Sequence, residues 1–350
     1  MITVRLALGI ALMAATLAAC GDDQPATSDQ RLVYVEQSAG GNLGGRIVSV
    51  NADGEQRQVL WEQPSGQADV LQAFVYPSPS GATVLFVDIG QQSWFTLPAA
   101  GGTATPFAKP VDAGSPHWAP DESVIAWLVG GSSPTIRIGT AAPGSTTLTL
   151  LTPDTILAQQ FQWSPDGSQI AFEGRLDAAG EDHIFTIART GGDVHPLSTA
   201  PENHDVTPAW SPSGEWIAFV REAGTDRGIW AAHPDGSQAR SVSPGVFDRY
   251  SGLYWSPDGT RLAAALNGPG NLTVIDFATG AQTQLHLASS GGNPWSPDGK
   301  RITYLGRTPP DVNNNTGPAV GVSTPNGANP VHVSPDSVYG SGQSWLAPAR

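Results

Sequence analysis

The chain has 350 residues, of which 39% are hydrophobic and only 14% charged, with 41 glycines and 30 prolines. So many chain breakers exclude a helical bundle or a coiled coil and favour short strands joined by turns. The 31 acidic residues outnumber the 17 basic ones, and the formal net charge of −14 disfavours nucleic-acid binding. A single cysteine, Cys20, excludes intrachain disulfides and cysteine-based zinc sites.

The first twenty residues have the features of a secretory signal. Leu6 to Leu17 is a run of apolar and small residues that is too short to span a bilayer comfortably. It ends in Leu17-Ala18-Ala19-Cys20, which resembles the bacterial lipobox, whose cysteine is diacylated and becomes the mature N-terminus. We therefore predict a lipoprotein signal peptide over residues 1–19, the lipidated Cys20 with a flexible tether over 20–30, and a folded domain over 31–350. An ordinary signal peptide cut elsewhere is the alternative.

The rest of the chain is dominated by one repeat. The motif Trp-Ser-Pro-Asp-Gly is intact at Trp163, Trp255 and Trp295. Diverged copies begin at Tyr76, Trp118, Trp210 and Trp345, so that successive starts lie 40 to 50 residues apart. That period fits a four-stranded propeller blade. A β-rich run and a glycine-containing hairpin turn follow in the repeat, as at Ile170–Phe172 and Arg189–Gly192.

The two ends of the folded domain complement each other. Leu32–Val35, Arg46–Val50 and Gln56–Leu60 read as three strands without a preceding motif, whereas no strands follow the motif at Trp345. Joining the C-terminal strand to the N-terminal three completes one blade and closes the ring. We therefore predict an all-β chain with a single seven-bladed β-propeller of four-stranded antiparallel blades. Six blades are the fallback if the Tyr76 repeat has degenerated.

The repeats carry a family resemblance. Trp-Ser-Pro-Asp-Gly followed by Ile170-Ala171-Phe172 resembles the TolB-type propeller repeat, a relative of WD repeats, over about Arg31 to Arg350. TolB itself has an N-terminal α/β domain before a six-bladed propeller and is not lipidated. Here only Gly21–Gln30 separates the lipobox from the first strand. The resemblance implies the propeller fold in a bacterial envelope lipoprotein that is not TolB, and it brings over none of TolB's partners.

Most conspicuous side chains have a structural interpretation. The motif aspartates are expected to make local hydrogen bonds in their own turns, and the motif tryptophans to pack between blades. Asp311-Val-Asn-Asn-Asn-Thr-Gly resembles the start of a calcium loop, but Thr316 and Val322 stand where Gly and Glu belong, which favours a surface loop. No serine-hydrolase, zinc-protease, phosphate-loop or dinucleotide fingerprint occurs, and we assign no catalytic residue, metal or cofactor.

The approach to each innermost strand is the candidate site. In a propeller these segments encircle one mouth of the central channel, and a polar, largely acidic binding rim is the functional interpretation, with solvated loops as the alternative. The candidate residues are Asp69, Asp112, His117, His204, Asp205, Asp248, Arg249 and Tyr339.

Two functions are compatible with such a rim. The first is a lipid-anchored, monomeric envelope propeller, facing the periplasm or the cell exterior, that binds a basic or neutral protein or small ligand without catalysis. The alternative is an enzyme, either a metal-dependent polysaccharide lyase or another propeller enzyme, because some propellers with similar repeats degrade acidic sugars. Related propeller peptidases carry a separate hydrolase domain. Because only His117 and His204 approach the mouth and Arg249 is the lone base there, we expect the module without catalysis.

Overall fold

The computed structural model describes residues 30–38, 45–64, 73–88, 92–130, 136–176, 180–197, 203–222, 227–247, 252–265, 272–285, 292–307, 318–334 and 338–346. Within these ranges all regular structure is β, with 27 strands and no helix. Accordingly, the described part of the chain contains no helix with the length and apolar character needed to cross a membrane.

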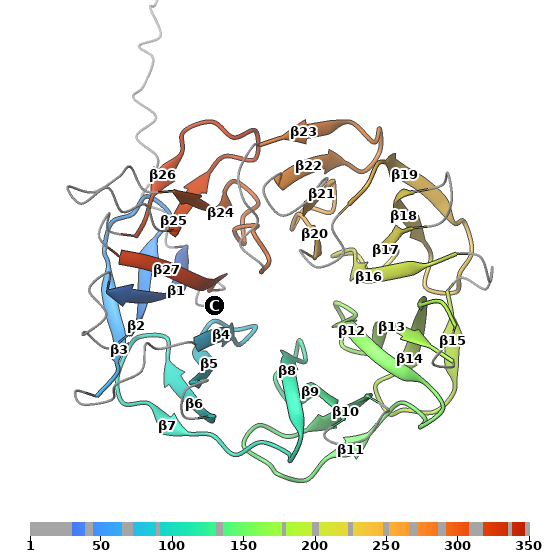
Figure 1. Cartoon of the computed structure of the whole chain (residues 1–350), viewed down its shortest axis with the longest axis horizontal. Helices are drawn as coiled ribbons and strands as arrows, with labels where there is room; N and C mark the ends of the chain where they lie inside the picture. The colour runs from blue at the N-terminus through green and yellow to red at the C-terminus, as the bar shows by residue number, and fades with distance from the viewer. Residues whose placement is uncertain are drawn as a thin grey trace, which may run out of the picture.

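The strands form seven antiparallel sheets, which stand like blades around a central axis (Figure 1). We number the blades from the N-terminus and give their strands from the centre outwards. Blade 1 consists of β27 (Val338–Trp345), β1 (Arg31–Ser38), β2 (Arg46–Asn51) and β3 (Gln58–Glu62), and blade 2 of β4 (Ala73–Pro77), β5 (Thr83–Asp88), β6 (Ser93–Pro98) and β7 (Thr105–Pro106). Blade 3 consists of β8 (Ala113–Trp118), β9 (Ile125–Val129), β10 (Arg137–Ala141) and β11 (Thr149–Leu150). Blade 4 consists of β12 (Leu157–Trp163), β13 (Gln169–Arg175), β14 (His183–Ala188) and β15 (Val194–Pro196). Blade 5 consists of β16 (Asp205–Trp210), β17 (Ile217–Arg221), β18 (Gly228–Ala232) and β19 (Arg240–Pro244). Blade 6 consists of β20 (Leu253–Trp255), β21 (Arg261–Ala265), β22 (Leu272–Asp276) and β23 (Gln282–Gln284). Blade 7 consists of β24 (Ile302–Arg307), β25 (Pro318–Ser323) and β26 (Val331–His332).

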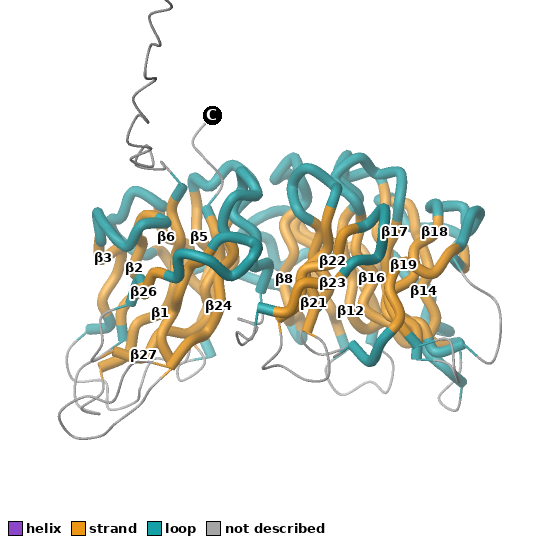
Figure 2. Tube along the Cα trace, turned by 90° about the horizontal axis from the view of Figure 1, so that it is seen from above, coloured by secondary structure: helices purple, strands orange, loops and turns teal. Residues whose placement is uncertain are grey.

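The predicted fold class is confirmed. Six of the seven sheets are complete four-stranded blades, and six is the number of blades in the fallback prediction. The remaining sheet, that of blade 7, has three strands. In blade 7 a single bridge between Trp295 and Ile302 occupies the place of the innermost strand. Seen from the side, the strands run roughly along the axis, and many of the described loops gather on one rim of the ring (Figure 2).

The ring closes through pairing of the N- and C-terminal strands, as predicted from the sequence. β27 comes last in the chain but pairs antiparallel with β1, from Leu32 opposite Trp345 to Ser38 opposite Val338. This pairing makes β27 the innermost strand of blade 1 and leaves β1 with a partner on both sides. Closure in this way removes a free sheet edge that would otherwise invite pairing with another chain.

The hydrophobic core is divided among the junctions between blades. Seven clusters of buried side chains are found in the described residues, each shared by two neighbouring blades. The cluster that joins blades 7 and 1 packs Val320 and Val322 against Leu32 and Tyr34. Because both faces of a blade are covered, many strands are buried along their length, as β17 is from Ile217 to Arg221. Continuous apolar runs, rather than strict alternation, are the consequence in the sequence.

The motif turns are held together locally, as the sequence predicted. In blade 4 the hydroxyl of Ser164 donates to Asp166 at 2.6 Å, and the same carboxylate accepts from the backbone N–H of Ser168 at 3.0 Å. Gly167 follows with φ +68°, a left-handed conformation that glycine adopts without strain. The hydrogen bond from Ser164, followed by those from Ser168, lowers the pKa of Asp166. The motif aspartate is therefore a turn residue.

The structure corrects the alignment of the motif in blade 2. The backbone N–H of Ser78 donates to Thr83 and that of Gly81 to Ser78, which are the bonds that Ser164 and Gly167 make in blade 4. Pro77 thus stands in the place of the motif tryptophan, and Tyr76 precedes it. The aromatic character of Tyr76 misled the sequence alignment, because an aromatic residue was expected at the first motif position.

The motif tryptophans link neighbouring blades, as predicted. The indole N–H of five of them donates to a backbone carbonyl on the preceding blade's inner strand, at 2.9 to 3.1 Å. The pairs are Trp118 with Tyr76, Trp163 with His117, Trp255 with Ala209, Trp295 with Tyr254, and Trp345 with Pro294. Trp210 is the exception, because its buried indole nitrogen has no hydrogen-bond partner among the described residues.

Candidate functional site

Two cavities lie among the innermost strands. The smaller, of about 290 Å³, is lined by parts of β8, β12, β16 and β20, including His117, Gln160, Thr207 and Tyr254. The larger, of about 840 Å³, is lined by the Trp ends of the inner strands and by the prolines of the motif turns that follow them. Neither lining includes a charged side chain among the described residues.

Three side chains line both cavities and therefore mark the junction between them, which we call the waist. They are His117 on β8, Gln162 on β12 and Tyr254 on β20. Each immediately precedes a motif tryptophan in the sequence. Because successive strand side chains point to opposite faces, a residue beside the packed tryptophan faces the channel. In blades 3, 4 and 6 the repeat thus places a residue that lines both cavities.

Bulges shape the wall of the smaller cavity. The register shifts between Gly114 and His117 in β8, between Ala158 and Phe161 in β12, and between Val206 and Ala209 in β16. A bulge turns residues out of the ladder and re-aims their side chains, and bulges are frequent next to active sites. In β16 the bulged residues, Thr207 and Pro208, line the smaller cavity.

His117 is held by its backbone and has a free ring. Its carbonyl oxygen accepts the indole N–H of Trp163 at 3.1 Å, and its ring lies against Phe161 with centroids 4.4 Å apart. The ring is exposed to the channel, and no hydrogen bond to it is found among the described residues. Desolvation by the surrounding protein lowers the pKa of His117 to about 4. The imidazole is therefore neutral at pH 7 and can accept a proton.

Tyr254 and Gln162 supply hydrogen-bonding groups at the waist. Burial raises the pKa of Tyr254 to about 12, so its hydroxyl stays protonated and can donate. The carbonyl oxygen of Tyr254 accepts the indole N–H of Trp295 at 3.1 Å. The side-chain oxygen of Gln162 accepts the backbone N–H of Trp210 at 2.6 Å, which fixes the amide between blades 4 and 5. The waist therefore combines a neutral base, a hydroxyl donor and an oriented amide.

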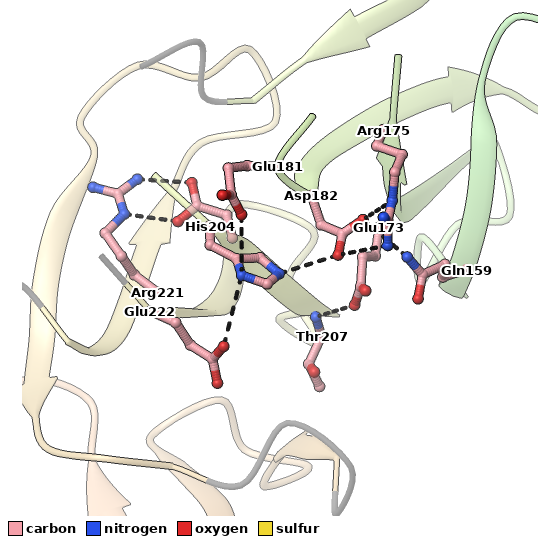
Figure 3. A network of polar contacts seen from close by, with 10 residues as sticks. Gln159, Glu173, Arg175, Glu181, Asp182, His204, Thr207, Arg221 and Glu222 are labelled. Carbon is pink, nitrogen blue, oxygen red and sulfur yellow. Dashed lines mark hydrogen bonds and ion pairs between the residues drawn. The ribbon is translucent and has the colours of Figure 1, made fainter. Parts of the chain in front are cut away.

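A second polar cluster joins blades 4 and 5 away from the waist (Figure 3). His204 lies just before β16, with ring nitrogens 3.1 Å from Asp182, 3.4 Å from Glu181 and 3.8 Å from Glu222. Asp182 also accepts hydrogen bonds from Arg175 at 2.8 Å and from Gln159 at 2.9 Å. The cluster is an inter-blade network in which every group drawn has a partner.

The residues expected at the channel mouth are dispersed in the structure. His117 lines both cavities, His204 belongs to the inter-blade network, and Asp112 is exposed in the turn before β8 with φ +57°. Asp205 is fully buried in a two-pronged ion pair with Arg221, at 2.7 and 2.8 Å, and so presents no surface to a ligand. Tyr339 pairs with Gln37 in the β27–β1 ladder, and its side chain is outside the description. Cys20, Asp69, Asp248, Arg249 and Asp311 lie outside the described residues.

Sequence reasoning missed Gln162, Thr207 and Tyr254. The signal for Gln162 and Tyr254 was present, since both occupy the position before a motif tryptophan, as His117 does. Thr207 gave no such signal, because its place in the cavity wall depends on the bulge in β16. Among the described residues, no group of three or more His, Cys, Asp or Glu side chains is arranged to hold a metal ion.

Comparisons with known proteins point to enzymes. No family model matches the chain. The chain is 28% identical over 147 residues to the uncharacterised peptidase YuxL of Bacillus subtilis (strain 168), covering 41% of this chain and 21% of that protein. It is 26% identical over 142 residues to dipeptidyl-peptidase 5 of Porphyromonas gingivalis, covering 36% and 20%. The matched part thus spans about a fifth of each relative's length.

Solved structures support the propeller fold. A puromycin-hydrolysing peptidase of Mycobacterium tuberculosis aligns with a TM-score of 0.64 and 14% identity over 87% of this chain and 52% of that one. A putative TolB of Agrobacterium tumefaciens aligns with a TM-score of 0.55 and 19% identity over 79% and 97%. An oligogalacturonate lyase in complex with manganese aligns with a TM-score of 0.56 and 15% identity over 87% and 84%. At these identities the likeness establishes the fold.

These findings correct the function expected from the sequence. The expectation of a binding module without catalysis is wrong, because two curated sequence relatives of the chain are peptidases. The expectation rested on the lack of catalytic motifs and on the small number of histidines at the channel mouth. It left out the channel-facing residues that precede the tryptophans. The enzyme alternative accounts better for the relatives and for the waist.

Proposed function

We propose that this chain is a peptidase-related propeller enzyme that binds an uncharged peptide segment in its central channel and hydrolyses it at the waist. The observation that carries the proposal is the neutral imidazole of His117, which is exposed in the channel within a wall of amide, hydroxyl and aromatic groups. Such a wall suits a peptide, because amides and hydroxyls can bond both its N–H and its C=O groups.

The proposed chemistry uses two waist residues. His117 accepts a proton from a water molecule while the water oxygen bonds to the peptide carbonyl carbon. Tyr254 donates a hydrogen bond to the carbonyl oxygen as that oxygen becomes negative. The imidazolium then returns the proton to the leaving nitrogen as the carbon–nitrogen bond breaks, which regenerates neutral His117. One water is consumed, and one amine and one acid are formed.

The choice of a peptide over an acidic sugar has two supports. The described lining of both cavities contains no Lys or Arg that would pair with carboxylates, and the chain as a whole carries a formal charge of −14. An acidic protein repels a polyanion, whereas it attracts basic segments and does not repel neutral ones. The described residues also do not fit a metal site, so a metal-dependent polysaccharide lyase is disfavoured, and no step is derived through a metal.

We also propose that the enzyme is a monomer held at the bacterial envelope by a lipid on Cys20, facing the periplasm or the cell exterior. The support is the sequence alone: an apolar run ends in Leu17-Ala18-Ala19-Cys20, and residues 21–30 provide a small, polar tether before β1. An anchored enzyme of this kind would meet short peptides in the envelope.

The test uses the purified protein with Ala-Ala-p-nitroanilide and the corresponding p-nitrophenyl ester, with and without EDTA. We expect chromophore release that EDTA leaves unchanged and that His117→Ala lowers at least about 100-fold, the usual range for a lost general base. Tyr254→Phe should lower kcat with little effect on KM, because its hydroxyl acts on the developing charge. His195→Ala, an exposed histidine on outer strand β15, is the matched control.

Two outcomes would contradict the proposal. One is no turnover of either substrate by the wild-type protein. The other is turnover that His117→Ala leaves unchanged, which would place the chemistry elsewhere. Loss of turnover in EDTA, together with activity on uronide polymers, would favour the lyase alternative instead.

A further inference from the structure

The wall of the smaller cavity contains a strained backbone residue. Thr207 has φ +58° and is only 3% exposed, and it stands inside the strand β16. Among the non-glycine residues described with positive φ, it is the only β-branched one. Left-handed backbone at such a residue is a true outlier that persists only where the surroundings enforce it.

A carboxylate of the neighbouring blade bonds to the backbone of Thr207. The backbone N–H of Thr207 donates to Oε2 of Glu173, 3.1 Å away on β13 (Figure 3). Glu173 is itself only 3% exposed. The bulge between Val206 and Ala209 removes Thr207 from the ladder with β17, so the carboxylate replaces a strand partner. If Glu173 is removed, this buried N–H loses that acceptor.

The position of Glu173 relative to β16 is fixed by a second contact. Arg175, two residues further along β13, pairs with Asp182 at 2.8 Å, and Asp182 contacts His204 at 3.1 Å. His204 is three residues before Thr207. Blade 4 therefore contacts the first part of blade 5 at two points. Asp182 contacts His204 just before β16, and Glu173 bonds to Thr207 at the bulge within β16. The next residue, Pro208, lines the smaller cavity together with Thr207.

We propose that Glu173 is a positioning residue for the channel, whose carboxylate keeps Thr207 in the left-handed conformation and so fixes the cavity wall that faces the substrate. The inference rests on the proposed function for its substrate, but the backbone effect is independent of it. Without the carboxylate, Thr207 relaxes towards an extended conformation, and Pro208 shifts with it.

The test of the backbone effect needs no substrate. Thr207→Gly is compared with Thr186→Gly, because Thr186 on β14 is also 3% exposed and lies in a regular strand. We expect Thr207→Gly to change Tm little or raise it, since glycine adopts positive φ without strain, and Thr186→Gly to lower Tm clearly. Equal losses in the two variants would overturn the proposal.

The test of positioning uses four proteins: wild type, Glu173→Gln, Glu173→Ala, and Glu173→Ala with Thr207→Gly. Amide hydrogen exchange over residues 203–210 should rise in Glu173→Ala and stay near wild type in Glu173→Gln, whose amide oxygen still accepts. Turnover of Ala-Ala-p-nitroanilide should show KM raised about tenfold in Glu173→Ala, because the shifted cavity wall fits the substrate less well; tenfold corresponds to about 1.4 kcal/mol of binding free energy. In the double variant, Thr207→Gly should bring KM most of the way back to the wild-type value. Glycine adopts positive φ without strain, so residue 207 is no longer driven towards an extended conformation.

The outcomes separate the two proposals. Unchanged exchange over residues 203–210 in Glu173→Ala overturns the positioning role whatever the turnover. Wild-type protein without turnover contradicts the proposed function, and the exchange and Tm comparisons then decide the role of Glu173 alone. Failure of Thr207→Gly to recover KM, with normal exchange in the double variant, would also count against positioning.

Discussion

The indole nitrogen of Trp163 donates a hydrogen bond to the carbonyl oxygen of His117, 3.1 Å away on the preceding blade. Trp295 makes the same contact with Tyr254 at 3.1 Å. The repeated tryptophans therefore do more than fill the junctions between blades, because they hold the backbone of two residues that face the waist. His117 and Tyr254 thus owe part of their fixed place in the channel to the tryptophan of the following blade.

Trp163→Phe tests this contact. The variant keeps a buried ring but removes the indole N–H, which leaves the His117 carbonyl without its donor, and we expect a loss of about 1–2 kcal/mol in the free energy of unfolding. Trp210→Phe is the matched control, because the indole nitrogen of Trp210 is buried without a partner and its removal should cost less. Urea denaturation measures both. Equal losses would mean that the indole hydrogen bond does not contribute.

Asp205→Ala should be severely destabilising. Asp205 is fully buried and forms a two-pronged ion pair with Arg221, whose guanidinium lies 4.2 Å from the ring centroid of Trp230. Removing one partner of a buried pair leaves an uncompensated charge and typically costs about 3–5 kcal/mol. In the exposed pair of Arg46 and Glu62, Glu62→Ala should cost less than about 1 kcal/mol. A thermal or urea unfolding series compares them. A mild loss in Asp205→Ala would argue that the pair is open to solvent.

The ring of His117 should titrate well below an ordinary histidine. Desolvation lowers its pKa in the folded protein to about 4, whereas the unfolded chain has the ordinary histidine value of 6.5. The unfolded state therefore binds the proton first, and this group lowers the free energy of unfolding as the pH falls from 6.5 towards 4. His117→Gln should remove that contribution. Ring NMR signals over pH 3 to 8 measure the midpoint directly. A midpoint at or above 6.5 would contradict the environment described.

The same shift sets a pH profile for the proposed reaction. Because the base must be neutral, kcat/KM should stay constant from pH 7 down to about pH 5 and fall only as His117 becomes protonated near its lowered pKa of about 4. A fall centred near 6.5 would indicate a different base. Measurement of initial rates with the p-nitroanilide substrate avoids any change in leaving-group protonation, because released p-nitroaniline stays neutral over this range.

Cys20→Ser tests the proposed anchor. The serine variant cannot be acylated on sulfur, so we expect a protein with unchanged Tm that moves from the membrane fraction to the soluble fraction on lysis. Cell fractionation followed by immunoblotting measures the distribution, and mass spectrometry of the N-terminal peptide detects the acyl chains. Membrane association that survives the substitution would argue for another means of attachment.

The fold followed from the sequence to a large degree, since local signals repeat along the chain. Pro-Asp-Gly turns form within five residues, as the Ser164–Ser168 segment shows, and hairpin neighbours lie close in sequence. Ring closure was also predictable, since the three N-terminal strands lacked a partner that the segment around Trp345 supplies. In blade 2 the motif was placed one residue too early, at Tyr76, because Pro77 stands where the other repeats have the tryptophan that identifies the motif.

The composition of the candidate site depended on how the blades meet, even though the position before a motif tryptophan marks three of its residues in the sequence. His117, Gln162 and Tyr254 are separated by 45 or more residues in the chain and meet only where the blades converge on one axis. Asp205 and His204 are adjacent in sequence, yet one is buried with Arg221 and the other contacts the carboxylates of blade 4. The sequence by itself determined the repeat, its turns and the closure of the ring, because those depend on neighbours within one blade. Only the tertiary structure decided which side chains face the channel and which are paired, because packing between blades, the bulges in the inner strands and the resulting desolvation arise only when the ring is assembled.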